Sequence, residues 1–110
     1  MVRPTRFEVA EATQSATLVL SIAGELDLNT ATELARRVED GLGRGASRVT
    51  LDLSALTFMD SSGLRLLIEL DQRAGRDSWE LGLIAPKHES ASAVLRLTGA
   101  DLALPFEGPV

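Results

Sequence analysis

The clearest hydrophobic pattern in the first part of the chain repeats every second residue. Leu18, Leu20 and Ile22 alternate with smaller or more polar residues. Successive side chains of a strand point to opposite sides, so this alternation is typical of a strand that buries one face. The pattern predicts a strand over residues 16–23.

A second, weaker strand is predicted immediately before it. Residues 6–10 place Phe7 and Val9 on one face, and the polar stretch 11–15 that follows has the composition of a turn. Two such segments with a short polar connection form a hairpin most simply. We therefore expect an edge strand and a turn behind a flexible tail over residues 1–5.

The period then changes to that of a helix. Between residues 30 and 42, apolar residues recur at helical spacing on one face. Thr30 and Glu33 have the spacing of a capping box, in which two side chains satisfy free backbone N–H groups. Gly43 and Gly45 supply the stop signal. These signals predict a helix that begins at Thr30. Its apolar face consists of Ala31, Leu34, Ala35, Val38 and Leu42.

The middle of the chain has the pattern of a buried strand, a loop and a second helix. Residues 48–53 alternate, with three aliphatic side chains on one face. Residues 54–60 are predicted to form a loop, and a helix is predicted from Ser61 to about residue 74, where Gly75 ends it. This helix is apolar over most of its circumference, so we expect it to be buried against the sheet.

Two large apolar residues, Phe58 and Met59, close the predicted loop. At a crossing from strand to helix, such residues are more often part of the core than contacts for a partner. We predict that Phe58 is buried and leave Met59 open.

The last part of the chain continues the alternation of strand and helix. A strand is predicted over 79–84 and a helix over 89–97, with Gly99 as its left-handed stop. Residues 102–106 are predicted to form a last short strand, followed by a flexible tail over 107–110.

Strands that alternate with helices indicate an α/β domain. We predict a single domain over residues 6–106, with a mixed sheet of four to five strands covered mainly on one face by three helices. Strands joined by a helical crossover run parallel, whereas the N-terminal hairpin is antiparallel. A chain of 110 residues has room for one such core.

The composition narrows the range of functions. The chain is 45% apolar and 25% charged, the balance of a folded soluble protein. Its net charge of −5 speaks against a general nucleic-acid binder, because phosphate backbones attract basic surfaces. No apolar run reaches the ~20 residues of a membrane span, and no secretion signal is visible. We expect a cytoplasmic protein with no membrane insertion and no nucleic-acid partner.

The chain offers little for metal or cofactor chemistry. It has no cysteine and a single histidine, His88, so thiolate and histidine clusters are excluded. The segment 24–27 with Asn29 has acidic and amide groups, but the further ligands of a calcium loop do not follow in register. A strand end and a helix cap explain this segment, and no phosphate-binding glycine loop is present. We expect neither a metal nor a cofactor.

A row of polar residues, Asp60, Ser61 and Ser62, followed by Gly63, stands where the middle strand gives way to the helix. Aspartate and serine are preferred helix caps, and spacing alone favours capping over a functional serine. One cap needs only one such side chain, however, so the row has more polar groups than capping uses. A phosphate is also tolerated at a helix N-terminus, because of the free N–H groups and the helix dipole.

A serine hydrolase is a further reading of the same row, with Ser61 or Ser62 as nucleophile and His88 as base. An activated serine needs a base within hydrogen-bond reach. The run Met-Asp-Ser-Ser-Gly lacks the G-x-S-x-G pattern of the hydrolase elbow. A nucleotide- or anion-binding module also remains open, and it would need a pocket over the helix that starts at Ser61.

The chain resembles the STAS domains, and within them the bacterial anti-sigma factor antagonists. The resemblance rests on the run from Phe58 to Leu64, preceded by the strand 49–53, and is supported by the segment 24–27 with Thr30 and by residues 95–99. The order and spacing of these motifs match over nearly the whole chain. The Asp-Ser-Ser-Gly block is the most specific of them.

The resemblance implies a role and a set of site residues. Proteins of this type bind an anti-sigma factor that is also an ATP-dependent serine kinase; binding releases the sigma factor, and phosphorylation of the antagonist reverses the binding. By motif, Ser61 is the phosphoacceptor, with Ser62 as the alternative. Asp27 and Asp60 flank it on the partner-facing surface, and Ser62 and Gly63 shape the turn. The chain would be a kinase substrate, reset by a serine phosphatase, and not itself an enzyme.

A second role within the same family stays open. The chain would then be a STAS subunit of a larger signalling or lipid-transport complex, without phosphorylation. In the switching role, a phosphate on Ser61 would act through lost affinity for the partner and not through refolding, because the helix dipole offsets its charge.

Overall fold

The computed structural model describes residues 7–110, so the predicted tail over residues 1–5 lies outside the described part of the chain. A four-stranded sheet forms the centre of the domain, in the order β1-β2-β3-β4. The strand β1 pairs antiparallel with β2, and β2, β3 and β4 are parallel. The sheet is therefore mixed, as predicted. Its strands are β1 (Phe7–Gln14), β2 (Thr17–Leu26), β3 (Arg48–Met59) and β4 (Glu80–Ile84).

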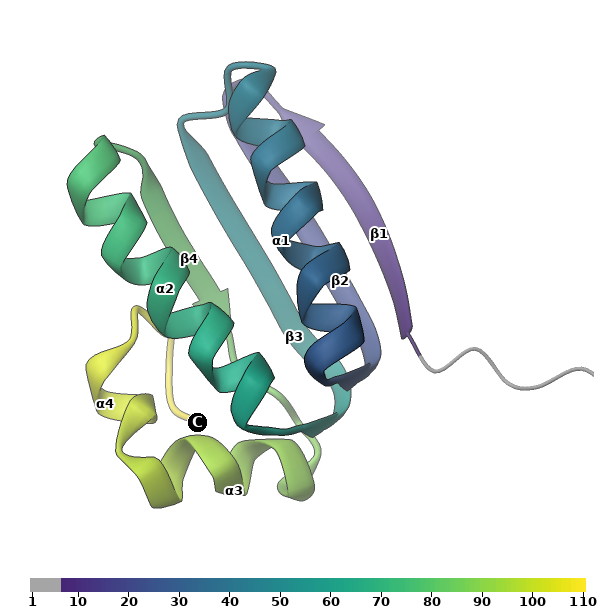
Figure 1. Ribbon diagram of the computed structural model, residues 1–110. Coiled ribbons are helices and arrows are strands. Elements are labelled where there is room, and N and C mark those ends of the chain that lie inside the picture. Colours follow the sequence, from purple (N-terminus) through teal and green to yellow (C-terminus); the bar gives the residue numbers. More distant parts are fainter. Residues whose placement is uncertain (1–6) are drawn as a thin grey trace, which may run out of the picture.

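Two long helices lie side by side across one face of the sheet (Figure 1). Each connects two neighbouring parallel strands, the arrangement that parallel pairing requires. A third helix crosses the lower edge, and a single further turn of helix follows it. The α/β fold with helices mainly on one face is confirmed, with one short helix more than predicted. The helices are α1 (Leu28–Gly43), α2 (Ser61–Asp77), α3 (Glu89–Thr98) and α4 (Ala100–Ala103).

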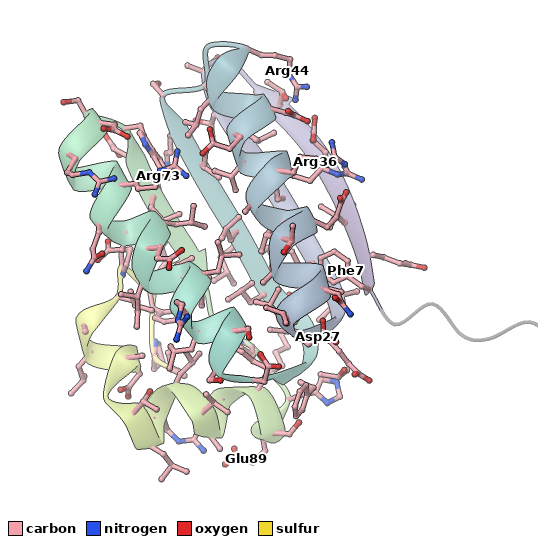
Figure 2. The ribbon with its side chains drawn as sticks, in the orientation of Figure 1. Phe7, Asp27, Arg36, Arg44, Arg73 and Glu89 are labelled. Carbon is pink, nitrogen blue, oxygen red and sulfur yellow. The ribbon has the colours of Figure 1, made fainter. Side chains whose placement is uncertain are left out.

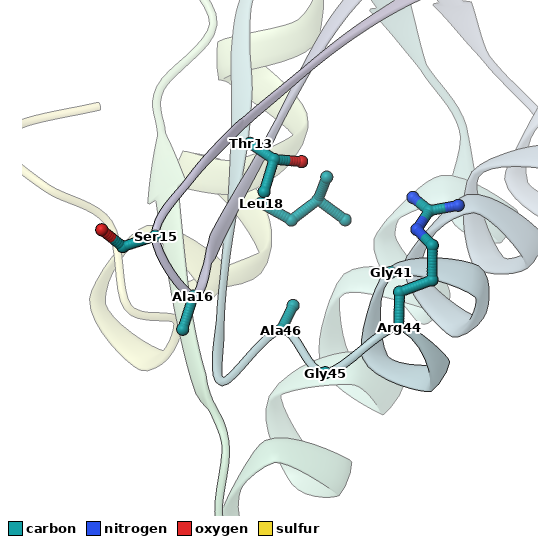
Figure 3. A pocket seen from close by; sticks show the side chains of 8 residues that line it. All are labelled: Thr13, Ser15, Ala16, Leu18, Gly41, Arg44, Gly45 and Ala46. Atoms are coloured by element: carbon teal, nitrogen blue, oxygen red, sulfur yellow. The ribbon is translucent and has the colours of Figure 1, made fainter.

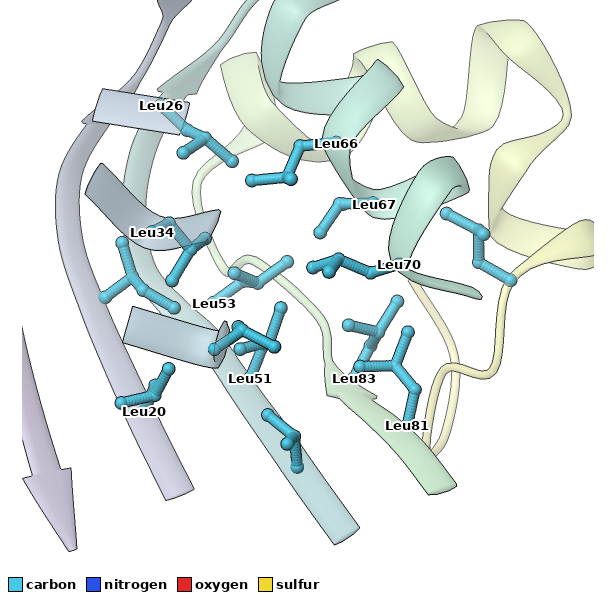
Figure 4. Close-up of a cluster of buried hydrophobic side chains, with 14 of the residues drawn as sticks. Leu20, Leu26, Leu34, Leu51, Leu53, Leu66, Leu67, Leu70, Leu81 and Leu83 are labelled. Carbon is cyan, nitrogen blue, oxygen red and sulfur yellow. The ribbon is translucent and has the colours of Figure 1, made fainter. Parts of the chain in front are cut away.

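Leucine side chains fill the space between the sheet and the two long helices (Figure 4). Full burial of each such side chain stabilises the fold by about 1.5–3 kcal/mol relative to exposure. The helix α2 contributes a narrower stripe than its composition suggested, because Ile68 is exposed and Leu64 is only half-buried. The largest fully buried side chains are Leu18, Leu20, Ile22, Leu26, Leu34, Leu51, Leu53, Leu56, Met59, Leu67, Leu70 and Leu83.

The predicted loop over residues 54–60 is wrong, because β3 continues to Met59. Its pairing with β2 slips twice, between Ser21 and Ala23 and between Gly24 and Glu25. Each slip puts an extra residue into β3, a β-bulge that reverses which side chains face the core. Local polar bonds replace the lost pairing, since the Ser54 N–H donates to Asp52 Oδ1 at 3.0 Å.

The two bulges explain why the prediction for Phe58 is wrong. The core-facing residues of β3 run through Leu51 and Leu53, then shift to Leu56 and finally to Met59. Met59 is only 1% exposed, while Phe58 faces outward and is 44% exposed. A uniform alternation cannot reproduce this order.

Two further boundaries differ from the prediction. The stretch 11–15 was predicted to be a turn, but β1 continues to Gln14, which pairs with Thr17 of β2. The helix α2 continues through Gly75 to Asp77. Its C-cap, Ser78, adopts the left-handed conformation with φ of 61°. The predicted helix with Gly99 as its left-handed stop is confirmed, and Gly99 has φ of 79°.

The predicted strand over residues 102–106 is wrong in most of its length. The helix α4 occupies residues 100–103, and only Phe106 pairs with Leu83 of β4, as an isolated parallel bridge. The Glu107 N–H donates to the Leu83 carbonyl at 2.8 Å, and Arg48 of β3 binds the Glu107 carboxylate at 2.6 Å. The flexibility of residues 107–110 stays a prediction.

Candidate functional site

The two long helices begin at the same edge of the sheet. Because β2 and β3 are parallel neighbours with Leu26 opposite Met59, their carboxyl ends lie together. The next residues, Asp27 and Asp60, are the N-caps of α1 and α2. Figure 2 shows Asp27 at the lower end of α1, beside the loop that leads into α2. Ligands and partners of parallel sheets commonly meet the protein at this edge.

The Asp27 junction is a closed capping box. The Asp27 carboxylate accepts the N–H groups of Asn29 and Thr30, both at 3.0 Å. The Thr30 hydroxyl accepts the Asp27 N–H at 2.8 Å and donates to the Glu25 carbonyl at 2.8 Å. The predicted cap at Thr30 with Glu33 is therefore wrong: Thr30 is the third residue of the helix, and Glu33 binds Arg36 at 2.7 Å instead.

The Asp27 carboxylate is held in its charged form. The backbone N–H of Thr30, above all, lowers the pKa of Asp27 below its usual value, while desolvation acts in the opposite direction. The Thr30 hydroxyl and then the backbone N–H of Asn29 lower this pKa further. The charge also lies at the positive end of the α1 dipole, where an anion is favoured. The structure therefore uses Asp27 fully as a cap.

The Asp60 junction uses a different arrangement. The Asp60 carboxylate accepts the N–H groups of Ser62 at 2.9 Å and Gly63 at 3.2 Å. The Asp60 N–H itself donates to the Leu26 carbonyl at 3.2 Å, so the adjacent strand takes the place that the Thr30 hydroxyl has in the first junction. One carboxylate thus completes the cap of α2.

Gly63 is buried where α2 passes closest to the end of β2. A Cβ at this position would lie 2.8 Å from Leu26 Cγ, 2.9 Å from the Leu26 carbonyl oxygen and 2.9 Å from Met59 Cγ. One of these neighbours is backbone and cannot move aside easily. Gly63 therefore shapes the turn by permitting this approach, and it has no side chain to offer a partner.

Ser61 and Ser62 are not used by the cap. Ser61 is exposed and Ser62 is half-buried, and neither hydroxyl takes part in a hydrogen bond within residues 7–110. The surplus of polar groups noted in the sequence is therefore present in the structure, on the surface and at the positive end of the α2 dipole.

His88 is the N-cap of α3, and its side chain caps nothing. It is exposed, and none of the hydrogen bonds among residues 7–110 joins it to Ser61 or Ser62. Within the same residues, no group of three acidic or histidine side chains is placed to hold a metal ion. No helix of the described chain has the length and apolarity needed to cross a membrane.

Two hollows lie at opposite ends of α1. The smaller, of about 80 Å³, is shown in Figure 3 and is lined by residues of the β1–β2 turn, with Arg44 at its side. The larger, of about 260 Å³, is a groove between α1 and α2 that reaches Ser62. Small-molecule sites usually measure ~300–1,000 Å³, so neither hollow has the size of a nucleotide pocket.

Sequence reasoning missed one residue at this edge. Leu28, the first residue of α1, is 68% exposed and lines the larger groove together with Ser62. No local signal marks it, because Leu28 stands three residues before Ala31 and seven before Ala35, the spacing of the apolar face of the helix.

Comparison with known proteins identifies the family. The protein-family model described as "Mlab, STAS domain" matches residues 9–105. Among curated proteins, the chain is similar to the anti-sigma-F factor antagonist RsfB of Mycobacterium tuberculosis, with 33% identity over 85 residues, 77% of this chain and 69% of RsfB.

Solved structures show the same fold. An anti-sigma factor antagonist from Mycobacterium paratuberculosis superposes with a TM-score of 0.80 at 23% identity, covering 100% of this chain and 92% of that one. The antagonist SpoIIAA in its unphosphorylated form gives 0.70 at 21% identity, with 93% and 88% covered. SpoIIAA of Bacillus in its phosphorylated form gives 0.66 at 20%, with 93% and 91% covered. Because the family model covers residues 9–105, the chain belongs to the STAS-domain family.

Proposed function

We propose that this protein is an anti-sigma factor antagonist switched by phosphorylation of Ser61. It binds an anti-sigma factor that is also a serine kinase, so that the sigma factor is released. The observation that carries the proposal is the exposed Ser61 hydroxyl, which the cap of α2 leaves unused. The 33% identity to RsfB supports the choice of partner.

The switch follows from charge at this edge of the sheet. In the kinase reaction the Ser61 hydroxyl oxygen bonds to the γ-phosphorus of ATP, ADP leaves, and the hydroxyl proton is released. The product carries about −1.5 to −2 charges at neutral pH. The α2 dipole offsets part of this charge within the domain. In the complex, Asp27 and Asp60 lie on the same surface, so the phosphate is repelled and is costly to desolvate.

The remaining assignments belong to the same proposal. The protein acts by binding its partner. It is the substrate of a kinase and is not itself an enzyme. A serine phosphatase removes the phosphate and restores binding. Both reactions take place in the cytoplasm, where the sigma factor acts.

The first test is phosphorylation in vitro. Purified anti-sigma kinases from the same genome are incubated with the protein, Mg²⁺ and ATP, and the phosphosite is mapped by mass spectrometry. We expect phosphate on Ser61 in wild type and in Ser62→Ala, and none in Ser61→Ala. Phosphate on Ser62 in wild type would move the acceptor by one residue. The Ser62→Ala control keeps the cap, because Asp60 binds the backbone N–H at that position.

The second test measures affinity by calorimetry. Ser61→Asp adds a charge where α2 favours it, so the midpoint of thermal unfolding should stay within a few degrees of wild type. Its affinity for the anti-sigma kinase should fall about 100-fold, because the added carboxylate lies beside Asp60 and must be desolvated in the complex. Equal binding by wild type and Ser61→Asp would contradict the switch.

A second candidate function is a STAS subunit of a larger signalling or lipid-transport complex. The match to the model described as "Mlab, STAS domain" favours it. In that role Ser61 would contribute surface shape and no kinase would modify it. Co-purification of the tagged protein with a multi-subunit assembly, together with no phosphorylation by any anti-sigma kinase, would select this function.

A further inference from the structure

The larger groove lies between the N-terminal halves of α1 and α2. Its floor is formed by Ala31, Ala35 and Leu66, and Leu28 and Ser62 stand at its mouth. The groove exists because α1 presents two alanines, one helical turn apart, towards α2. At the other end the helices are joined by an ion pair between Arg73 and Glu39, and Figure 2 shows Arg73 on the side of α2 that faces α1. The groove therefore lies at the end of the two helices that carries Ser61.

The groove has an apolar interior, and its charged lining residues carry no net charge. Leu66 and Ala31 are each 8% exposed at its floor, while Leu28 stands 68% exposed beside them. Along the wall, Arg65 and Glu69 balance each other in charge. Asp27 directly precedes the lining residue Leu28, and its carboxylate is bound to the first turn of α1.

We infer that this groove receives an aliphatic side chain of the anti-sigma factor. The inference rests on the proposed function and names the part of the surface that supplies its binding energy. The volume of about 260 Å³ suits side chains of a protein and is below the usual range of ~300–1,000 Å³ for small ligands. The groove is continuous with the switching site, because Ser62 lines it and Ser61 precedes it.

This placement gives the phosphate a second effect. A phosphate on Ser61 stands at the entrance of the groove, where the bound partner would exclude water. It therefore opposes both the docking of the aliphatic side chain and the burial of Leu28. Phosphorylation of Ser61 therefore weakens the apolar contact in the groove as well as adding charge to the interface.

Truncation of Leu28 tests the inference. The probe is the purified anti-sigma kinase that phosphorylates Ser61 in the assay above. Leu28→Ala should weaken binding about 10-fold, the usual loss for an apolar anchor at an interface. Leu97→Ala and Leu102→Ala are matched controls, since these side chains are 87% and 90% exposed on α3 and α4. Both controls should bind within about twofold of wild type.

A second variant fills the groove. Ala35→Met adds a flexible side chain to its half-buried floor, in a residue that a helix tolerates well. It should weaken binding about 10-fold with an unchanged circular dichroism spectrum. If Leu28→Ala and Ala35→Met both bind like wild type, this inference is overturned and the proposed function stands. If wild type binds no anti-sigma kinase, both are overturned.

Discussion

The two strand-to-helix junctions at the sheet edge match position by position but differ in chemistry. Asp27 and Asp60 are the N-caps of adjacent helices, and each carboxylate accepts two backbone N–H groups. The first helical residue is Leu28 in α1 and Ser61 in α2, and both are exposed. The third is Thr30 in α1, which completes a capping box, and Gly63 in α2, which cannot.

The difference shows how one junction is built for stability and the other for close packing and access. At the first, Thr30 ties the cap to the preceding strand through Glu25. At the second, the adjacent strand supplies that bond, Gly63 admits the helix, and the two hydroxyls remain on the surface. Substitutions at the matched positions test this difference.

The largest expected effect on stability is at Gly63. Gly63→Ala places a Cβ within 2.9 Å of three atoms, one of them the Leu26 carbonyl oxygen. We expect a loss of about 1–3 kcal/mol in the free energy of unfolding, measured by urea titration, as for other overpacked sites. In the same helix, Gly75→Ala is the control, because nothing lies within 4 Å of its Cβ. It should gain about 0.5–1 kcal/mol; a loss of equal size in both would contradict the packing argument.

The next effect is the loss of each cap. Asp27→Ala should cost about 1–2 kcal/mol of unfolding free energy, and Asp60→Ala only about 0.5–1 kcal/mol. The reason is the residue that follows each aspartate. Ser61 can become the N-cap if α2 shortens by one residue, whereas Leu28 has no polar group with which to cap α1. Ser61→Ala in the Asp60→Ala background should then remove the difference. Equal losses from the two single variants would show that the junctions are equivalent.

The smallest effect is on the pH dependence of stability. The folded pKa of Asp27 lies below its unfolded value of about 3.9, so its contribution is complete well above that pH and is lost as the pH falls through the folded pKa. Asp27→Asn keeps a capping oxygen but does not titrate. Urea titrations between about pH 5 and pH 2.5 should show wild type losing more stability than Asp27→Asn. Parallel curves would mean that the carboxylate is not favoured by folding.

The fold could be predicted from the sequence because the spacing of apolar residues changes clearly between strands and helices. Alternation at Leu18–Ile22 and helical spacing at Ala31–Val38 each identify an element, since both patterns have one buried side. The predicted start of the first helix was wrong because two nearby residues are equally suitable as its N-cap. Asp27 and Thr30 are both good caps, and only the bond from Thr30 to Glu25 in the strand decides between them.

The two bulges in β3 were beyond reach of the sequence. They lie in the pairing of β3 with β2, two segments far apart in the sequence, and they exchange the roles of Phe58 and Met59. In the candidate site, Asp27, Asp60 and Gly63 were named from a resemblance, and the structure gives each of them a physical reason. The groove at Leu28 was missed, because it arises from the gap between two helices and not from any local pattern.

The contacts of Phe106 and Glu107 with β4 have a consequence for synthesis of the chain. The outer edge of β4 has free backbone groups until Pro105 and Glu107 bind Leu83. An exposed edge strand can pair with another chain. While the protein is made from its N-terminus, β2, β3 and both long helices can assemble before this edge is covered. Nascent domains on neighbouring ribosomes are therefore open to mispairing at β4 until residues 105–107 emerge. Arg48, which also binds Glu107, then holds the covering segment in place.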